Sequence, residues 1–115
     1  MPYQVLKHED YVEVRVQGVL ESALDFEDQS LADADESHRL LLDMAGVTEI
    51  RADAYLLAEQ ARKAEARGIK MAVYAPRPAV FGLNRQALQL GAIREGISAG
   101  VFSSLEEAKA WLQAG

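Results

Sequence analysis

The sequence contains no cysteine, and acidic residues outnumber basic ones. The absence of cysteine excludes disulfides, thiolate nucleophiles and sulfur-ligated metals within the chain. Lys and Arg number 12 against 18 Asp and Glu, which gives a net charge of −6. Because nucleic-acid binding depends on clustered cations that displace counterions from phosphates, we expect no nucleic-acid partner.

Long apolar runs are also missing. Stretches such as Arg39–Leu42 and Met71–Ala75 have the length of a strand, whereas a membrane-spanning helix needs about 20 apolar residues. The start of the chain lacks the basic-then-apolar pattern of a signal peptide. We therefore expect no membrane span and a cytoplasmic location.

Recognisable catalytic and metal-binding motifs are absent as well. The two histidines, His8 and His38, have no third ligand at the spacing of a metal site. The sequence has no Gly-x-Ser-x-Gly motif and no glycine-rich phosphate loop. We expect a protein that is not an enzyme and that uses no metal or other cofactor.

The chain has enough apolar material for one core. Of its 115 residues 50% are hydrophobic, which suits a single domain over residues 1–115. Residues 21–36 carry seven acidic side chains and no basic one. Such a segment can steer a basic partner toward the protein.

Hydrophobic periodicity predicts strands in two settings. Tyr3–Lys7 and Tyr11–Gln17 form a hairpin, in which alternating valines of the second strand share one face. Arg39–Met44 is a continuous apolar run and is typical of a central strand that is buried on both faces. Further strands are expected at Ile69–Ala75 and Gly100–Phe102.

Helices are predicted between these strands, over residues 22–36, 52–67 and 78–90, and from Ser104 to the end. The second helix has an apolar stripe of Ala54, Leu57, Ala58, Ala61 and Ala64, and the third one of Val80, Leu83, Ala87 and Leu90. Ser104 and Glu107 have the spacing of a capping box. The order ββαβαβαβα predicts an α/β fold, with a mixed sheet of about five strands and about four helices.

Two segments resemble the STAS family of anti-sigma-factor antagonists. Leu40–Ile50 reads LLLDMAGVTEI and Ala66–Pro76 reads ARGIKMAVYAP, which are similar to the family patterns LLLDxxGVTxI and ARGxKxAVxxP. Val101–Ala108 resembles the strand-then-helix ending of the same family. The resemblance implies a SpoIIAA-like single domain that binds a protein partner, such as an anti-sigma-factor kinase or a related regulator.

The phosphorylation loop of this family is replaced. Where phosphorylatable members have Asp-Ser-Ser-Gly, this chain has Arg51-Ala52-Asp53-Ala54, so Asp53 occupies the phosphoacceptor position. Two interpretations of Asp53 stay open. It mimics a phosphoserine with about half its charge or slightly more, or it stabilises the start of the following helix through the macrodipole. Thr48 is interpreted as a turn hydroxyl.

A second branch of the fold, the STAS/CRAL-TRIO-like group, offers an alternative. Ala75-Pro76 and Phe81–Arg85 resemble its Ala-Pro and Phe-Gly pattern, which implies a carrier with an apolar cleft beside Tyr74, Val80, Phe81 and Leu83. A further alternative is a homodimer that pairs through the edge strand Tyr3–Lys7. The predicted binding residues are Gly46, Thr48, Arg51, Asp53, Pro76, Arg77 and Phe81.

Overall fold

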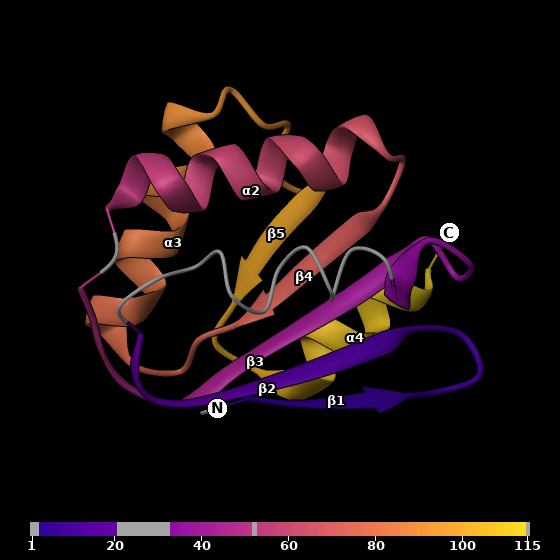
Figure 1. Cartoon of the computed structure of the whole chain (residues 1–115), viewed down its shortest axis with the longest axis horizontal. Coiled ribbons are helices and arrows are strands. Elements are labelled where there is room, and N and C mark those ends of the chain that lie inside the picture. Colours follow the sequence, from indigo (N-terminus) through magenta and orange to yellow (C-terminus); the bar gives the residue numbers. More distant parts are fainter. Residues whose placement is uncertain (1–2, 21–32, 52, 115) are drawn as a thin grey trace.

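The computed structural model describes residues 3–20, 33–51 and 53–114 (Figure 1). The elements are β1 (Tyr3–Lys7), β2 (Val12–Leu20), β3 (Arg39–Ile50), α2 (Ala54–Ala66), β4 (Lys70–Tyr74), α3 (Pro78–Leu90), β5 (Ala99–Phe102) and α4 (Leu105–Gln113). The helix predicted over 22–36 falls mostly outside the described residues. No helix in the described ranges is long and apolar enough to cross a membrane.

The strands form one mixed sheet whose spatial order, β1-β2-β3-β4-β5, follows the sequence. Strand β1 is antiparallel to β2, and their turn is closed by the His8 N–H, which donates to the Tyr11 carbonyl over 2.9 Å. Strands β2 to β5 are mutually parallel. Helices α2 and α3 make successive crossovers on the same face (Figure 1), as right-handed connections require. The carboxyl ends of the parallel strands consequently lie at the same end of the sheet.

The main core lies between the sheet and helices α2 and α3. Alternate residues of β2 and β3 supply its centre, and all are nearly inaccessible to solvent: Val12, Val14, Val16, Leu40, Leu42 and Met44. The predicted common face of the β2 valines is thereby confirmed. Arg62 fastens the two helices together, because its guanidinium donates to the carbonyls of Leu90 and Gly91 at the end of α3.

Helix α4 covers the other face of the sheet. Its Ala108 and Leu112 are fully buried against Leu41 and Ala72. The Ser104 side chain accepts a hydrogen bond from the Glu107 N–H over 3.3 Å, which confirms the predicted helix start.

The last turn of α4 is tied to strand β4 by one lysine. The Lys70 Nζ donates to the Trp111 carbonyl over 2.6 Å and lies 4.3 Å from the centroid of the indole ring. An ammonium in this position interacts favourably with a carbonyl of the last helical turn and with the face of the aromatic ring. Trp111 thereby anchors the end of α4 against strand β4.

The sequence prediction ends β2 and β3 too early. Strand β2 continues to Leu20 and β3 to Ile50, and their ladder resumes at Gln17 opposite Gly46 after a register shift. Gly18, which the sequence prediction takes as a strand end, lies inside β2 with a φ of +78°. Because glycine tolerates this conformation, the ladder passes through an irregularity instead of stopping. The β-branched residues beyond Gly46 then favour the extended backbone.

The packing of α4 is tested by Leu112→Ala. Leu112 is 0% exposed, so its truncation leaves a cavity and should lower the free energy of unfolding by about 2–5 kcal/mol. The exposed neighbour Gln113 provides a control, since Gln113→Ala should change the same free energy by less than about 0.5 kcal/mol. Urea denaturation measures both, and equal destabilisation by the two substitutions would contradict the described packing.

Candidate functional site

The predicted binding residues from Gly46 to Asp53 lie along one segment, from the second half of β3 to the start of α2. Gly46 and Thr48 lie in the half of β3 that extends beyond β4 and pairs with β2 alone. Thr48 is therefore in a strand and not in the turn that the sequence predicts, and its side chain is exposed. Arg51 and Asp53 follow, at the connection to α2. The extension of β3 thus carries these residues past the carboxyl end of its neighbour β4.

Gly46 has a structural reason to be glycine. A Cβ at this position would lie 2.9 Å from the Gln17 Cγ and 3.3 Å from the Val16 carbonyl oxygen. Both contacts are closer than a Cβ normally makes, so a side chain at residue 46 would require Gln17 to move and the β2 backbone to shift slightly, and glycine fits the shifted register best. Gly46 shapes the segment and offers only backbone to a partner.

Asp53 is the N-cap residue of α2. Its Oδ1 accepts a hydrogen bond from the Tyr55 N–H over 2.8 Å, and its backbone is extended, with φ −66° and ψ 139°. A carboxylate in this position satisfies a helix N–H and interacts favourably with the helix dipole. The helix-start interpretation of Asp53 accordingly has direct structural support.

Arg51 connects the strand ladder to the surface. Its N–H donates to the Leu20 carbonyl over 2.8 Å, which closes the β2–β3 pairing. Its Nε lies 3.4 Å from the Glu49 Oε1, and both side chains are more than half exposed. Such a pair contributes little to stability because solvent screens it. The two charges are consequently accessible to a partner.

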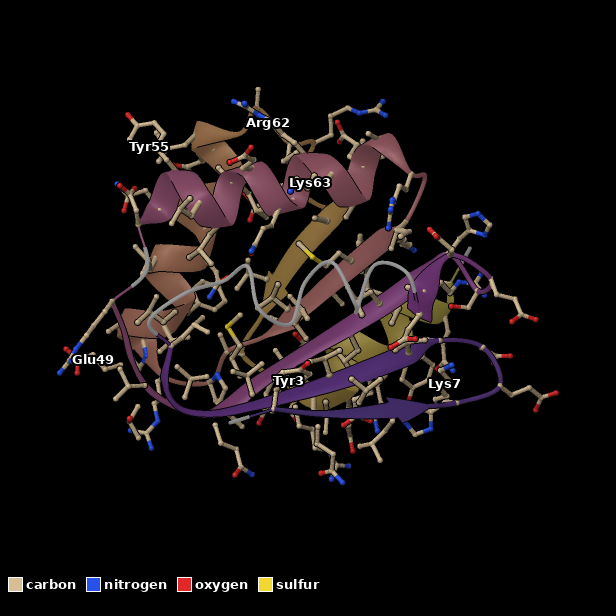
Figure 2. All side chains as sticks on the ribbon, viewed as in Figure 1. Tyr3, Lys7, Glu49, Tyr55, Arg62 and Lys63 are labelled. Carbon is tan, nitrogen blue, oxygen red and sulfur yellow. The ribbon has the colours of Figure 1, made fainter. Side chains whose placement is uncertain are left out.

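Sequence reasoning missed the aromatic side chain of this region. Tyr55, in the first turn of α2, is 68% exposed, and Val19 at the end of β2 is 37% exposed. Figure 2 shows Tyr55 projecting outward at the start of α2, on the same side of the view as Glu49. The available signal was position, because Tyr55 is an aromatic residue that falls outside the predicted apolar stripe of its helix.

The predicted residues after β4 divide between surface and core. Pro76 and Arg77 are exposed, immediately before the first turn of α3. Phe81 is half-buried and packs against the main core. Tyr74 packs instead with the cluster under α4, on the opposite face of the sheet. The expected cleft that joins Tyr74 to Phe81 is therefore wrong, since the sheet separates the two rings.

The most deeply buried carboxylate of the described residues lies away from this region. Glu13, in β2, is 4% exposed; its Oε2 accepts from the Arg15 Nε over 2.6 Å, and its Oε1 lies 2.9 Å from the His8 Nε2. Burial alone would raise the pKa of Glu13, but the hydrogen bonds from Arg15 and His8 outweigh it and hold the pKa below its ordinary value. General acid catalysis at neutral pH needs the opposite shift.

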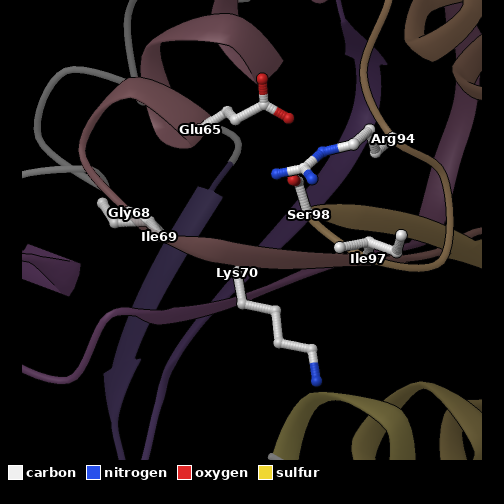
Figure 3. A pocket seen from close by; sticks show the side chains of 7 residues that line it. All are labelled: Glu65, Gly68, Ile69, Lys70, Arg94, Ile97 and Ser98. Carbon is white, nitrogen blue, oxygen red and sulfur yellow. The ribbon is translucent and has the colours of Figure 1, made fainter.

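A surface hollow of about 240 Å³ lies at the amino ends of β4 and β5 (Figure 3). Its lining includes Glu65, Arg94 and Ser98. Lys70 also borders it, but the Lys70 side chain points away toward α4, where its ammonium contacts Trp111. Because the strands are parallel, this hollow and the predicted binding residues occupy opposite ends of the sheet. Within the described ranges no three His, Asp or Glu side chains gather closely enough to hold a metal ion.

The architecture is the SpoIIAA-like fold, as the sequence predicts. An uncharacterised DUF3478-family protein from Shewanella loihica PV-4, described as having a SpoIIAA-like fold, matches with a TM-score of 0.59 and 16% identity, over 96% of this chain and 91% of its own. The unphosphorylated form of the anti-sigma-factor antagonist SpoIIAA matches with a TM-score of 0.55 and 16% identity, over 98% of this chain and 97% of its own. No family model and no curated protein matches the sequence.

The capping role of Asp53 is tested by two substitutions. Asp53→Ala removes the acceptor for the Tyr55 N–H and should lower the free energy of unfolding by about 1 kcal/mol. Asp53→Asn keeps a good N-cap and should cost less than half as much. Thermal or urea denaturation measures both, and an Asp53→Ala variant as stable as the parent would argue against the cap.

The ion pair of Glu13 predicts a specific pH dependence. Because the pKa of Glu13 is lowered by folding, its stabilisation is complete above the ordinary carboxyl pKa and is lost as the pH falls through the lower folded value. Glu13→Gln should therefore cost about 1–3 kcal/mol at neutral pH and flatten the loss of stability in acid. Glu9→Gln, at an exposed position, is the control and should change the free energy of unfolding at neutral pH by less than about 0.5 kcal/mol. A parental acid profile in Glu13→Gln would refute the assignment.

Proposed function

We propose that this protein is a non-catalytic regulatory module that binds a protein partner through a docking surface at the junction of β3 and α2. The docking surface comprises Val19, Thr48, Glu49, Arg51, Asp53 and Tyr55, with Pro76 and Arg77 at its margin. A SpoIIAA-like fold, shared with an anti-sigma-factor antagonist, supports the class of module. The proposed partner is an anti-sigma-factor-like kinase or a related regulator, as the sequence resemblance implies.

The exposure of Tyr55 is the observation that carries the proposal. Exposed aromatic rings are costly to hydrate, and Tyr is enriched among the residues that dominate binding energy at protein interfaces. Tyr55 is 68% exposed, and Val19 adds a second exposed apolar group. Glu49 and Arg51 supply polar groups in the same segment. An aromatic anchor with a charged margin is the usual composition of a protein interface.

The module is proposed to work without a phosphorylation cycle at residue 53. A switch of that kind needs a hydroxyl at the start of α2, and this chain has Asp53 there. The Asp53 carboxylate is hydrogen-bonded to the helix backbone and carries about half a phosphate's charge or slightly more. The bound state would then be set by the concentrations of the module and its partner, in the cytoplasm and with residues 1–115 acting as one domain.

The apolar-carrier alternative has less support. Ligand pockets usually measure about 300–1,000 Å³, whereas the small cavity that lies between the sheet and helices α2 and α3 measures about 20 Å³. The homodimer alternative would use the outer edge of β1, which in the described residues pairs on one side only. Among the residues that the structure describes, neither alternative has an exposed aromatic side chain comparable to Tyr55.

The docking surface is tested by truncation of its aromatic residue. With a partner captured from cell extract and then purified, Tyr55→Ala should weaken binding by about 30-fold, the effect of losing roughly 2 kcal/mol at an interface anchor. Ile97→Ala is the matched control, because Ile97 is 62% exposed and lies at the opposite end of the sheet. Calorimetric titration gives both dissociation constants. Parental affinity in Tyr55→Ala, or equal loss in the two variants, would place the partner elsewhere.

A further inference from the structure

Helix α2 presents an amide side chain to the core. Gln60 is 4% exposed, and among the described residues neither its Nε2 nor its Oε1 has a hydrogen-bond partner. A buried amide without partners is strongly unfavourable, because folding removes its hydrogen bonds to water and returns none. The great majority of buried polar groups in proteins are satisfied, by protein groups or by ordered water. The two polar atoms of Gln60 therefore indicate a bound molecule that serves as their hydrogen-bond partner.

A small cavity adjoins Gln60. It lies between α2, α3 and strands β3 and β4, has a volume of about 20 Å³, and is bordered by Met44, Met71 and a second amide, Asn84. A water molecule needs about 10–15 Å³ of such space and two to four polar partners. The cavity is large enough for one water molecule, and it is far too small for an apolar metabolite.

Asn84 supplies the other polar wall. It is 5% exposed, and its Nδ2 donates to the Val80 carbonyl over 2.9 Å and lies 3.4 Å from the Met44 Sδ. These contacts occupy the amide nitrogen and leave the side-chain oxygen as an acceptor for a further donor. Gln60 offers both a donor and an acceptor, whichever way its amide is turned.

We propose that this cavity binds one structural water molecule, which hydrogen-bonds to the Gln60 amide and to the side-chain oxygen of Asn84. Gln60 belongs to α2 and Asn84 to α3, so the water links the two helices on the side that faces the sheet. It complements the bonds from Arg62 to the end of α3 at the surface. The site stands independently of any partner at the docking surface.

Water–protein NMR on the intact, isotope-labelled chain tests this site. The side-chain NH₂ of Gln60 should show NOE and ROE cross-peaks of opposite sign at the water frequency, the signature of a long-lived bound water. Gln60→Met preserves the length of the side chain but removes both polar atoms, so the slowly exchanging water should be lost. Gln86→Met, at an exposed position of α3, should leave the Gln60 signals unchanged.

The wild-type spectrum decides the matter even if Gln60→Met fails to fold. The proposal would be overturned if the water cross-peaks at Gln60 were absent, or if they showed a water molecule that exchanges at the rate of bulk water. A high-resolution crystal structure gives an independent reading. A density peak within hydrogen-bonding distance of Gln60 and Asn84 supports the site, and an empty cavity with Gln60 bonded to protein groups refutes it.

Discussion

The structure depends on the pairing of β3 with β2 along almost the whole length of β3. The first half of β3 is flanked by β2 and β4, and its alternating residues serve both cores, with Leu40 and Leu42 under α2 and α3 and Leu41 under α4. The second half pairs with β2 alone. This second half places Thr48, and after it Arg51 and the start of α2, at the carboxyl end of the sheet, beyond the end of β4.

The same constraint explains the roles of the polar residues near the candidate site. Gly46 allows the register shift that lets the ladder continue, Arg51 closes it with a backbone hydrogen bond, and Asp53 begins the helix. Away from that site, on the sheet face covered by α4, the hydrogen bonds from Arg15 and His8 favour the ionised form of Glu13. These groups are all engaged in interactions that hold the fold.

Much of the fold follows from local patterns in the sequence. Periodicity predicts two strands, through the valines of β2 and the apolar run of β3. Helix-start signals predict two helices, through Pro78 at the start of α3 and Ser104 before α4. The extended β2–β3 ladder does not follow in this way, because the irregularity at Gly18 and Gly46 depends on cross-strand packing.

The side chains of the proposed docking surface and of the buried cavity were harder to predict. Gln60 and Asn84 are polar residues on inward faces, and only the arrangement of both helices shows that they share one cavity. Tyr74 and Phe81 are close in sequence, yet they lie on opposite faces of the sheet, because strand alternation directs Tyr74 toward α4 whereas Phe81 belongs to α3 on the other face. Tyr55 lies outside the predicted apolar stripe of its helix, but its residue type suits a core as well as a surface, so its exposure became evident only from the structure.

Site-specific photo-crosslinking tests the central claim most directly. A photoreactive phenylalanine analogue replaces Tyr55 in one version of the chain and Ile97 in another, so that two similarly exposed probes lie at opposite ends of the sheet. Irradiation in extract from the source cells should yield a discrete protein adduct from position 55 and none of that mass from position 97. The same adduct from position 97 alone, or from both positions with equal yield, would contradict a docking surface at the start of α2.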